Sequence, residues 1–478
     1  MRPQAAALLL LPTLACAVGP NYTKPEVPVP QSWNEGRATE ATQSAASLAT
    51  WWTQFQDATL DRLVNEAVAG NLELKIAAAR IREARAARGI AASAGLPQVE
   101  VAGAYARTQR SEAVPPFKAT PGIGAPFGPR EQNVFEAGFD ASWEIDIFGG
   151  VRRDKEAALA DVQAAEEGRR EVLVTLLADV GRSYLELRGT QQQLRILEET
   201  LASEQDTLDL AKSRFDAGLA TELDVARAEG LLKANEAERP VLERQIREAI
   251  YRLGVLIGKE PSALATDLET AADIPPVPPE IPMTLPSELL SRRPDLKRAE
   301  RELAAATARI GVARADLFPR FSILGSFGRR SEDIGDFTKG SAQFWNIIPA
   351  VRWPIFSGGR IRANIEVQNA RQEQALLQYE KDILTALAEV ENALSAHTRE
   401  RSREASLKAA VDSTRRALAL ATDRYTSGLE NFLSVLDAER SVYAAEDQLV
   451  RSEKNTAVTL IAVYKALGGG WSADTPPS

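Results

Sequence analysis

An internal repeat constrains the fold of this chain more than any other feature of its sequence. The segment Arg214-Phe-Asp-Ala-Gly218-Leu219 returns 210 residues later as Arg424-Tyr-Thr-Ser-Gly428-Leu429. The same offset pairs Leu223 with Leu433, Val225 with Val435, Ala228 with Ala438, Glu229 with Glu439 and Gly258 with Gly468. An offset that holds over such a length indicates two structural copies in tandem.

Residue counts exclude most kinds of catalytic and metal centre. The 478 residues include one cysteine, Cys16, and one histidine, His397, so an intrachain disulfide, a His/Cys metal site and a Ser-His-Asp or Cys-His triad are not expected. A net charge of −9 argues against a nucleic-acid partner. The glycine pairs lack the context of a nucleotide-binding loop. We therefore expect no cofactor, and an enzyme would have to use carboxylates alone, for which no paired motif stands out.

The N-terminus has the features of an export signal. Arg2 precedes a short apolar stretch, and small residues follow it, which predicts a signal peptide over residues 1–15. The segment Thr13-Leu14-Ala15-Cys16 resembles a lipobox, although Leu14 stands two residues before the cysteine where the usual pattern has three. We expect Cys16 to be acylated, palmitate included; cleavage after Ala15 or Ala17 without acylation is the alternative. No later segment offers about 18 consecutive apolar residues, so strands are the expected means of entering a membrane.

Alternating apolar and polar residues predict two pairs of strands. From Phe135 to Ile147 the odd positions are apolar or alanine, whereas the even positions include four carboxylates, Glu136, Asp140, Glu144 and Asp146. The expected strands cover about 97–111 and 132–148 in the first copy and about 319–330 and 342–356 in the second. Pro97 and Pro319 stand at strand starts, where a missing N–H is tolerated.

A long helical hairpin is expected after each strand pair. In the first copy the apolar stripe has a strict seven-residue spacing, which indicates left-handed supercoiled packing: Leu173, Val180, Leu187, Leu194, Leu201, Leu208 and Phe215. The second stripe is polar in the middle: Ile383, Val390, His397, Glu404, Val411, Leu418 and Tyr425. Gly218 and Gly428 suit the helix ends, and Thr221 and Asn431 suit the starts of the partner helices. The hairpins are expected at about 150–257 and 359–467.

These elements give the expected domain limits: a signal peptide at 1–15, an extended arm at 16–50, a first repeat at 51–258, a Pro-rich linker at 259–285, a second repeat at 286–468 and a tail at 469–478. The fold class is mixed α and β. Four strands are too few to close an outer-membrane barrel, whereas three chains would supply twelve. A homotrimer in contact with outer-membrane lipid is therefore expected, with the hairpins forming an α-helical tube.

The chain resembles the TolC-type outer-membrane efflux proteins, and more closely their lipidated OprM-like branch. The motifs that carry the resemblance are Cys16-Ala-Val-Gly-Pro-Asn-Tyr22, Trp143-Glu-Ile-Asp-Ile-Phe-Gly149, Leu290-Ser-Arg-Arg-Pro-Asp295, Leu317-Phe-Pro319, Arg424-Tyr425-x-x-Gly428, Val435-Leu-Asp-Ala438 and Tyr464-Lys-Ala-Leu-Gly-Gly-Gly-Trp471. The resemblance implies a trimeric exit duct that spans outer membrane and periplasm. It also implies a periplasmic adaptor and an inner-membrane pump, of the resistance-nodulation-division type, as partners in multidrug export. A coiled-coil lipoprotein scaffold or adhesin without a channel is the alternative.

The resemblance also assigns roles to individual residues. Leu433 and Asp437, one helical turn apart, match positions that narrow the periplasmic end of the duct; a solvated surface aspartate is the alternative. The expected adaptor contacts are the tip residues Arg214, Phe215, Gly218, Leu219, Arg424, Tyr425, Gly428 and Leu429, some of which turn geometry alone would also require. The alternating strand pattern itself, and not the resemblance, predicts that Glu136, Asp140, Glu144 and Asp146 line the lumen or the inner barrel wall and favour cations; polar residues needed there in any case are the alternative.

Overall fold

The computed structural model describes residues 17–35, 48–111, 113, 131–278 and 285–472. The chain divides into two compact units. The first comprises Met1–Pro25, Arg82–Gln163 and Glu300–Leu377, and the second Glu26–Ile81, Ala164–Ala299 and Gln378–Ser478. Within the described residues, no helix has the length and apolar character needed to cross a bilayer.

The secondary structure confirms the tandem repeat. Three pairs of corresponding elements have equal lengths: helices α3 (Leu72–Ser93) and α9 (Pro294–Ala315) with 22 residues each, strands β1 (Gln98–Gln109) and β3 (Arg320–Ser331) with 12 each, and helices α4 (Gly150–Asp216) and α10 (Arg360–Thr426) with 67 each. The other helices and 3-10 turns are η1 (Trp51–Phe55), α2 (Ala58–Gly70), η2 (Pro261–Leu264), α7 (Ala265–Leu268), α8 (Pro286–Arg292), η3 (Ile334–Asp336) and η4 (Gly340–Ala342).

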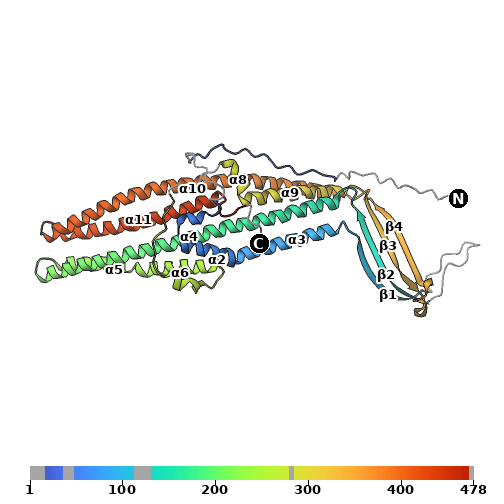
Figure 1. Cartoon of the computed structure of the whole chain (residues 1–478), viewed down its shortest axis with the longest axis horizontal. Helices are drawn as coiled ribbons and strands as arrows, with labels where there is room; N and C mark the ends of the chain where they lie inside the picture. Colours follow the sequence, from blue (N-terminus) through green and yellow to red (C-terminus); the bar gives the residue numbers. More distant parts are fainter. Residues whose placement is uncertain (1–16, 36–47, 112, 114–130, 279–284, 473–478) are drawn as a thin grey trace, which may run out of the picture. The chain divides into compact units, whose positions relative to one another are not determined.

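A four-stranded antiparallel sheet dominates the first unit (Figure 1). Its order is β1-β2-β3-β4, with β2 at Glu131–Ile145 and β4 at Gln343–Arg352. Strand β4 ends before the expected limit because Pro354, which has no N–H to donate, follows two residues later. Among the described strands, β1 and β4 each have one unpaired edge, so a single chain leaves this sheet open on both sides.

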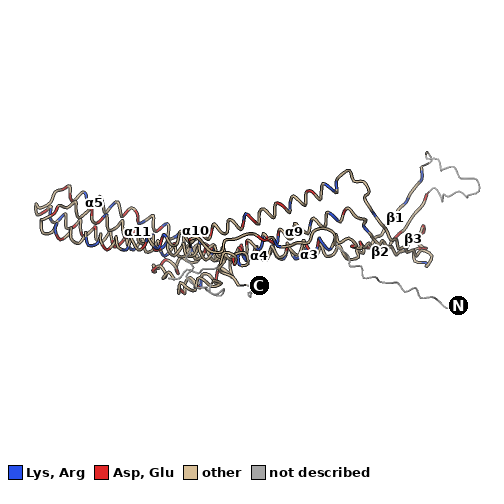
Figure 2. The backbone as a smooth tube through the Cα atoms, turned by 90° about the horizontal axis from the view of Figure 1, so that it is seen from above, with Lys and Arg blue, Asp and Glu red and all other residues tan. Residues whose placement is uncertain are grey.

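The second unit contains most of the two helical hairpins (Figure 1). Helix α4 is followed by α5 (Glu222–Glu236) and α6 (Arg239–Leu256), and α10 by α11 (Phe432–Ala466). The expected single partner helix in the first copy is therefore interrupted, because Pro240 lacks an N–H and favours a new helix start. Figure 2 shows acidic and basic residues interspersed along the helices.

Both hairpin tips use the same backbone motif. Gly218 and Gly428 have φ of 73° and 76°, a left-handed conformation that glycine adopts without strain. In the first tip, Gly218 N–H donates to the Phe215 carbonyl at 2.8 Å and Leu219 N–H to the Arg214 carbonyl at 2.7 Å. The second tip repeats both bonds at 3.0 and 2.8 Å. This is a Schellman ending, which stops each long helix at its glycine.

The arm, the linker and the tail pack onto the hairpins within the second unit. Leu48 of the arm is fully buried, and Trp51, which follows the arm as the first residue of η1, stacks on Tyr464 of α11 with a ring separation of 5.4 Å. Gly470 N–H donates to the Leu48 carbonyl at 2.9 Å, and Arg188 of α4 donates to the Thr270 carbonyl at 3.0 Å. These contacts hold three irregular segments against one continuous apolar core.

Candidate functional site: the sheet faces and the hairpin tips

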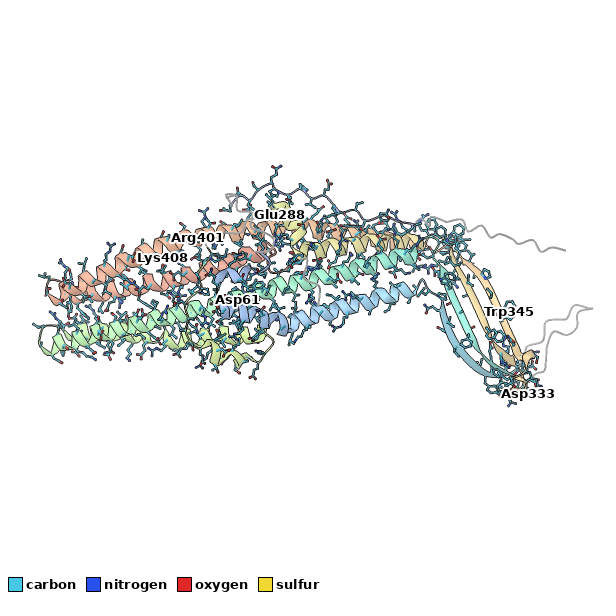
Figure 3. All side chains as sticks on the ribbon, in the orientation of Figure 1. Asp61, Glu288, Asp333, Trp345, Arg401 and Lys408 are labelled. Atoms are coloured by element: carbon cyan, nitrogen blue, oxygen red, sulfur yellow. The ribbon has the colours of Figure 1, made fainter. Side chains whose placement is uncertain are left out.

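One face of the sheet is apolar and exposed. The strand register places Val101, Phe139, Phe327 and Trp345 in one row across all four strands. Val101 is 75% exposed and Trp345 70%, and Figure 3 shows Trp345 on β4. Further exposed apolar side chains on this face are Val99, Tyr105, Trp143, Ile347 and Val351. A contiguous apolar face of this kind is unfavourable in water but suits contact with lipid hydrocarbon.

The opposite face of β2 carries three of the expected carboxylates. Glu136 forms an ion pair with Arg330 of β3 at 2.8 Å, and Glu144 lies 3.9 Å from Arg320. Asp140 accepts a hydrogen bond from the Ser326 hydroxyl at 2.8 Å. Because two of these three carboxylates face an arginine, the negative potential of this face is weaker than the carboxylates alone would produce.

The prediction that Asp146 continues this polar face was wrong. Strand β2 ends at Ile145, and the Asp146 carboxylate accepts from the backbone N–H groups of Val151 and Arg152 at 3.1 and 2.9 Å. The Arg152 side chain also pairs with Asp146 at 3.2 Å. Asp146 therefore satisfies free N–H groups at the start of α4 and fixes the turn from strand to helix.

Arg214 joins the tips of the two hairpins. Its guanidinium lies over the Tyr425 ring, 4.6 Å from the ring centre, and donates to the Thr426 carbonyl at 3.4 Å. Tyr425 packs against Phe432 in turn, with a ring separation of 5.2 Å. The corresponding Arg424 lies 3.6 Å from Glu430 within its own hairpin. The two equivalent arginines therefore differ: Arg214 contacts the other hairpin, whereas Arg424 contacts its own.

The other tip residues remain open to solvent in the chain. Phe215, Leu219 and Leu429 are exposed although they are large and apolar. The Schellman geometry rests on the glycine and two main-chain hydrogen bonds, and these apolar side chains stay exposed beside it. The tips therefore present apolar surface that a partner could cover.

Leu433 and Asp437 lie on one exposed face of α11. The residues between them that point the other way, Val435 and Leu436, are buried in the apolar cluster of the hairpins. At the equivalent position of Asp437 the first copy has Arg227, which is also exposed. The two copies therefore present opposite charges at the same place in the hairpin.

Two buried carboxylates in this region were not anticipated. Glu204 of α4 is 2% exposed and Glu439 of α11 is 6% exposed. Burial raises the pKa of Glu439 to about 7, with a smaller rise from the charge of Glu204, and burial also raises the pKa of Glu204. The sequence did contain a signal, because Glu204 falls on the stripe of Leu201 and Leu208, and Glu439 on that of Phe432 and Val435.

His397 is fully buried on α10. Its Nδ1 lies 3.1 Å from both the Thr456 carbonyl and the Thr459 hydroxyl of α11. Burial lowers its pKa, so the imidazole is neutral and acts as a packed core residue, as its position on the stripe predicts. Within the part of the chain that the structure describes, no group of three or more His, Cys, Asp or Glu is placed to hold a metal ion. Cys16 lies outside the described residues.

The sequence and fold both match known proteins. The family model described as outer membrane efflux protein matches residues 63–259 and 285–469. The chain belongs to the outer membrane efflux protein family. Outer membrane protein OprJ of Pseudomonas aeruginosa is 35% identical over 98% of this chain and 95% of its own length. Toluene efflux pump outer membrane protein TtgF of Pseudomonas putida is 32% identical over 95% of this chain and 94% of its own length.

Solved structures of family members share the fold. The outer-membrane channel OprN has a TM-score of 0.86 and 34% identity, covering 95% of this chain and all of its own. The open state of the MtrE outer membrane channel of Neisseria gonorrhoeae has a TM-score of 0.81 and 27% identity, covering 97% and 100%. The expected TolC-type fold is confirmed, and the chain is an outer-membrane channel component of a bacterial efflux pump. The alternative of a scaffold or adhesin without a channel is not supported, and membership is consistent with a protein that is not an enzyme.

Proposed function

We propose that this family member is the passive, gated exit channel of a tripartite efflux pump and works as a homotrimer. The observation that carries the proposal is the sheet, which has an exposed apolar face and, among its described strands, two unpaired edges. Three copies would close twelve strands into a barrel, so that no backbone edge meets lipid.

The molecular mass in detergent tests the trimer. Light scattering of the purified protein, corrected for bound detergent, should give slightly less than three times 51.9 kDa, because that chain mass still includes the expected signal peptide. A stable monomer that retains its strands would contradict the proposal, because its sheet edges would then be tolerated without partners.

The periplasmic gate would consist of Leu433 and Asp437 from each chain. Both side chains are exposed on one face of α11, and three copies near a common axis would form an apolar ring beside a ring of carboxylates. Asp437→Ala should raise conductance in a planar bilayer, because it removes charge and volume from the narrowest point. Arg227→Ala, at the equivalent exposed position of the first copy, is the matched control and should leave conductance unchanged.

The exposed tips would receive a periplasmic adaptor, which connects the channel to an inner-membrane pump of the resistance-nodulation-division type. Phe215, Leu219 and Leu429 supply apolar contact area, and Arg424 supplies a charge that the turn does not require. Gly218 and Gly428 would act by shaping the turn. Leu219→Asp and Leu429→Asp should therefore abolish co-purification with the adaptor while the trimer remains intact.

Acylation of Cys16 would anchor the mature chain to the outer membrane. The lipobox-like segment before it supports this proposal. Mass spectrometry of the mature N-terminal peptide should show a diacylglycerol-modified cysteine, and a terminus at an unmodified Cys16 or at Val18 would argue against the anchor. In the barrel, Glu136, Asp140 and Glu144 would favour cations only mildly, because Arg330 and Arg320 offset their charge.

A further inference from the structure

Glu204 and Glu439 occupy the contact between the two hairpins. Glu439 of α11 accepts a hydrogen bond from the Thr207 hydroxyl of α4 at 2.5 Å, and Glu204 of α4 accepts one from the Asn235 amide of α5 at 2.5 Å. Thr207 follows Glu204 by three residues, so both side chains lie on the same face of α4. The two carboxylates thus connect α11 to α4 and α4 to α5 in series.

Each carboxylate has one buried oxygen without a hydrogen-bond donor. Oε2 of Glu204 and Oε2 of Glu439 are both buried and unpartnered. A buried carboxylate oxygen without a donor is strongly unfavourable when the group is ionised, and much less so when the carboxyl is neutral. The geometry therefore favours a proton on this pair while the hairpins are packed together.

The charged groups around the pair do not neutralise it. Arg440 of α11 lowers the pKa of Glu204 only in part, since burial dominates and the pKa remains raised. Tyr443 of α11 lies near Glu204 and Glu238, and its own pKa is raised, chiefly by burial. Helix α10 contributes Leu418 and Ala421, which are apolar, to the same cluster. Glu204 and Glu439 therefore have Arg440 as a nearby cation, and its charge offsets the effect of burial only in part.

The tandem repeat supplies an internal comparison. Glu229 of α5 stands at the position equivalent to Glu439, but its side chain is exposed. The same residue type therefore occurs at the same place in both copies, and within a single chain only the second copy buries it, against α4. Burial of Glu439 is thus a property of this hairpin contact and not of the residue's position in its own helix.

We propose that Glu204 and Glu439 form a proton-operated latch: a proton bound by this buried pair holds α11 against α4, and its loss releases α11. The inference rests on the proposed gate, because α11 also carries Leu433 and Asp437. Release would expose Glu439 to water and allow both carboxylates to ionise. The channel should therefore be held closed in acid and open more readily as the pH rises.

Conductance of the full-length protein in planar bilayers tests the latch. With a pKa of about 7 when packed and the ordinary 4.5 when released, the opening equilibrium should rise on the order of 70-fold from about pH 5 to about pH 8. Glu439→Gln, which is neutral at every pH, should keep the low opening of the acid state at about pH 8. Glu229→Gln is the matched control and should retain the wild-type pH response.

Hydrogen exchange gives a measurement that does not depend on conduction. At the same alkaline pH, amides of residues 432–445 should exchange more slowly in Glu439→Gln than in the wild type, because the latch stays engaged. Equal exchange, a wild-type conductance independent of pH, or a Glu439→Gln channel whose pH response is as large as that of the wild type would overturn the latch, whereas a small residual response is expected from Glu204. A wild-type protein that conducts at no pH would instead contradict the exit-channel function, and the exchange comparison would then decide the latch alone.

Discussion

Removal of the Arg214 side chain should weaken the contact between the tips of the two hairpins. Its guanidinium lies 4.6 Å from the centre of the Tyr425 ring in the other hairpin and donates to the Thr426 carbonyl at 3.4 Å. Arg214→Ala removes both contacts and leaves the backbone of the tip unchanged, because the Schellman bonds involve only main-chain atoms of that residue.

The two contacts set the size of the effect. A cation–π contact at a partly exposed site contributes about 0.5–1 kcal/mol, and a long hydrogen bond from the guanidinium to a carbonyl adds about 0.5–1 kcal/mol. Together they stabilise the joined tips by about 1–2 kcal/mol, which corresponds to roughly 5- to 30-fold in the equilibrium for separating the hairpins.

Single-channel recording without adaptor measures this change as an increase in open probability. Arg424→Ala is the matched control, since Arg424 contacts Glu430 of its own hairpin and its removal should change open probability less than about 2-fold. Equal effects of the two substitutions, or no effect of Arg214→Ala, would refute the view that the Arg214–Tyr425 contact restrains the hairpins.

Three further predictions concern the stability of each unit. The buried Tyr184 hydroxyl donates a 2.7 Å hydrogen bond to the Asp57 carboxylate, and burial raises the pKa of this hydroxyl to about 12. Tyr184→Phe removes the bond, so the free energy of unfolding should fall by about 1.5–3 kcal/mol in denaturant titrations. A fall below about 0.5 kcal/mol would contradict this. Packing raises the pKa of Glu439 from 4.5 to about 7, so between these pH values the packed helices bind more protons than the separated ones. Helix packing should therefore weaken by about 3 kcal/mol as the pH rises from 4.5 to about 7, and Glu439→Gln should reduce this pH dependence in thermal melts, leaving the smaller contribution of Glu204. Gly19→Ala should release the N-terminal arm to proteases, since φ is 99° and an added Cβ would lie 2.5 Å from the Gly311 Cα; an equally protected arm would argue against that close approach.

The sequence predicted the features that depend on periodicity and on glycine. Alternation around Phe139 predicted β2 and its two faces, and the paired glycines Gly218 and Gly428 predicted where both long helices end. These features are local, because the strand pattern and the turn conformation are determined by neighbouring residues. The expected trimer came from the strand count together with the family resemblance, because no local pattern contains the assembly, and it stays a prediction.

The sequence could not predict contacts that depend on how the hairpins meet. Arg214 and Arg424 are equivalent in the repeat, yet one contacts the other hairpin and one its own. Asp146 continued the alternation of β2 but caps α4, because the strand ends one residue earlier. Pro240 is the sequence signal for the break before α6, but the similarity of the two copies favoured one continuous partner helix in each.

Duplication followed by divergence determines the symmetry with which the proposed trimer would dilate. Six hairpins would surround the axis, and identical copies would make them respond alike. The first copy instead has Arg227 and an exposed Glu229 where the second has Asp437 and a buried Glu439. If the buried pair acts as proposed, α11 of each chain would be the element that moves, so the opening would have threefold and not sixfold symmetry.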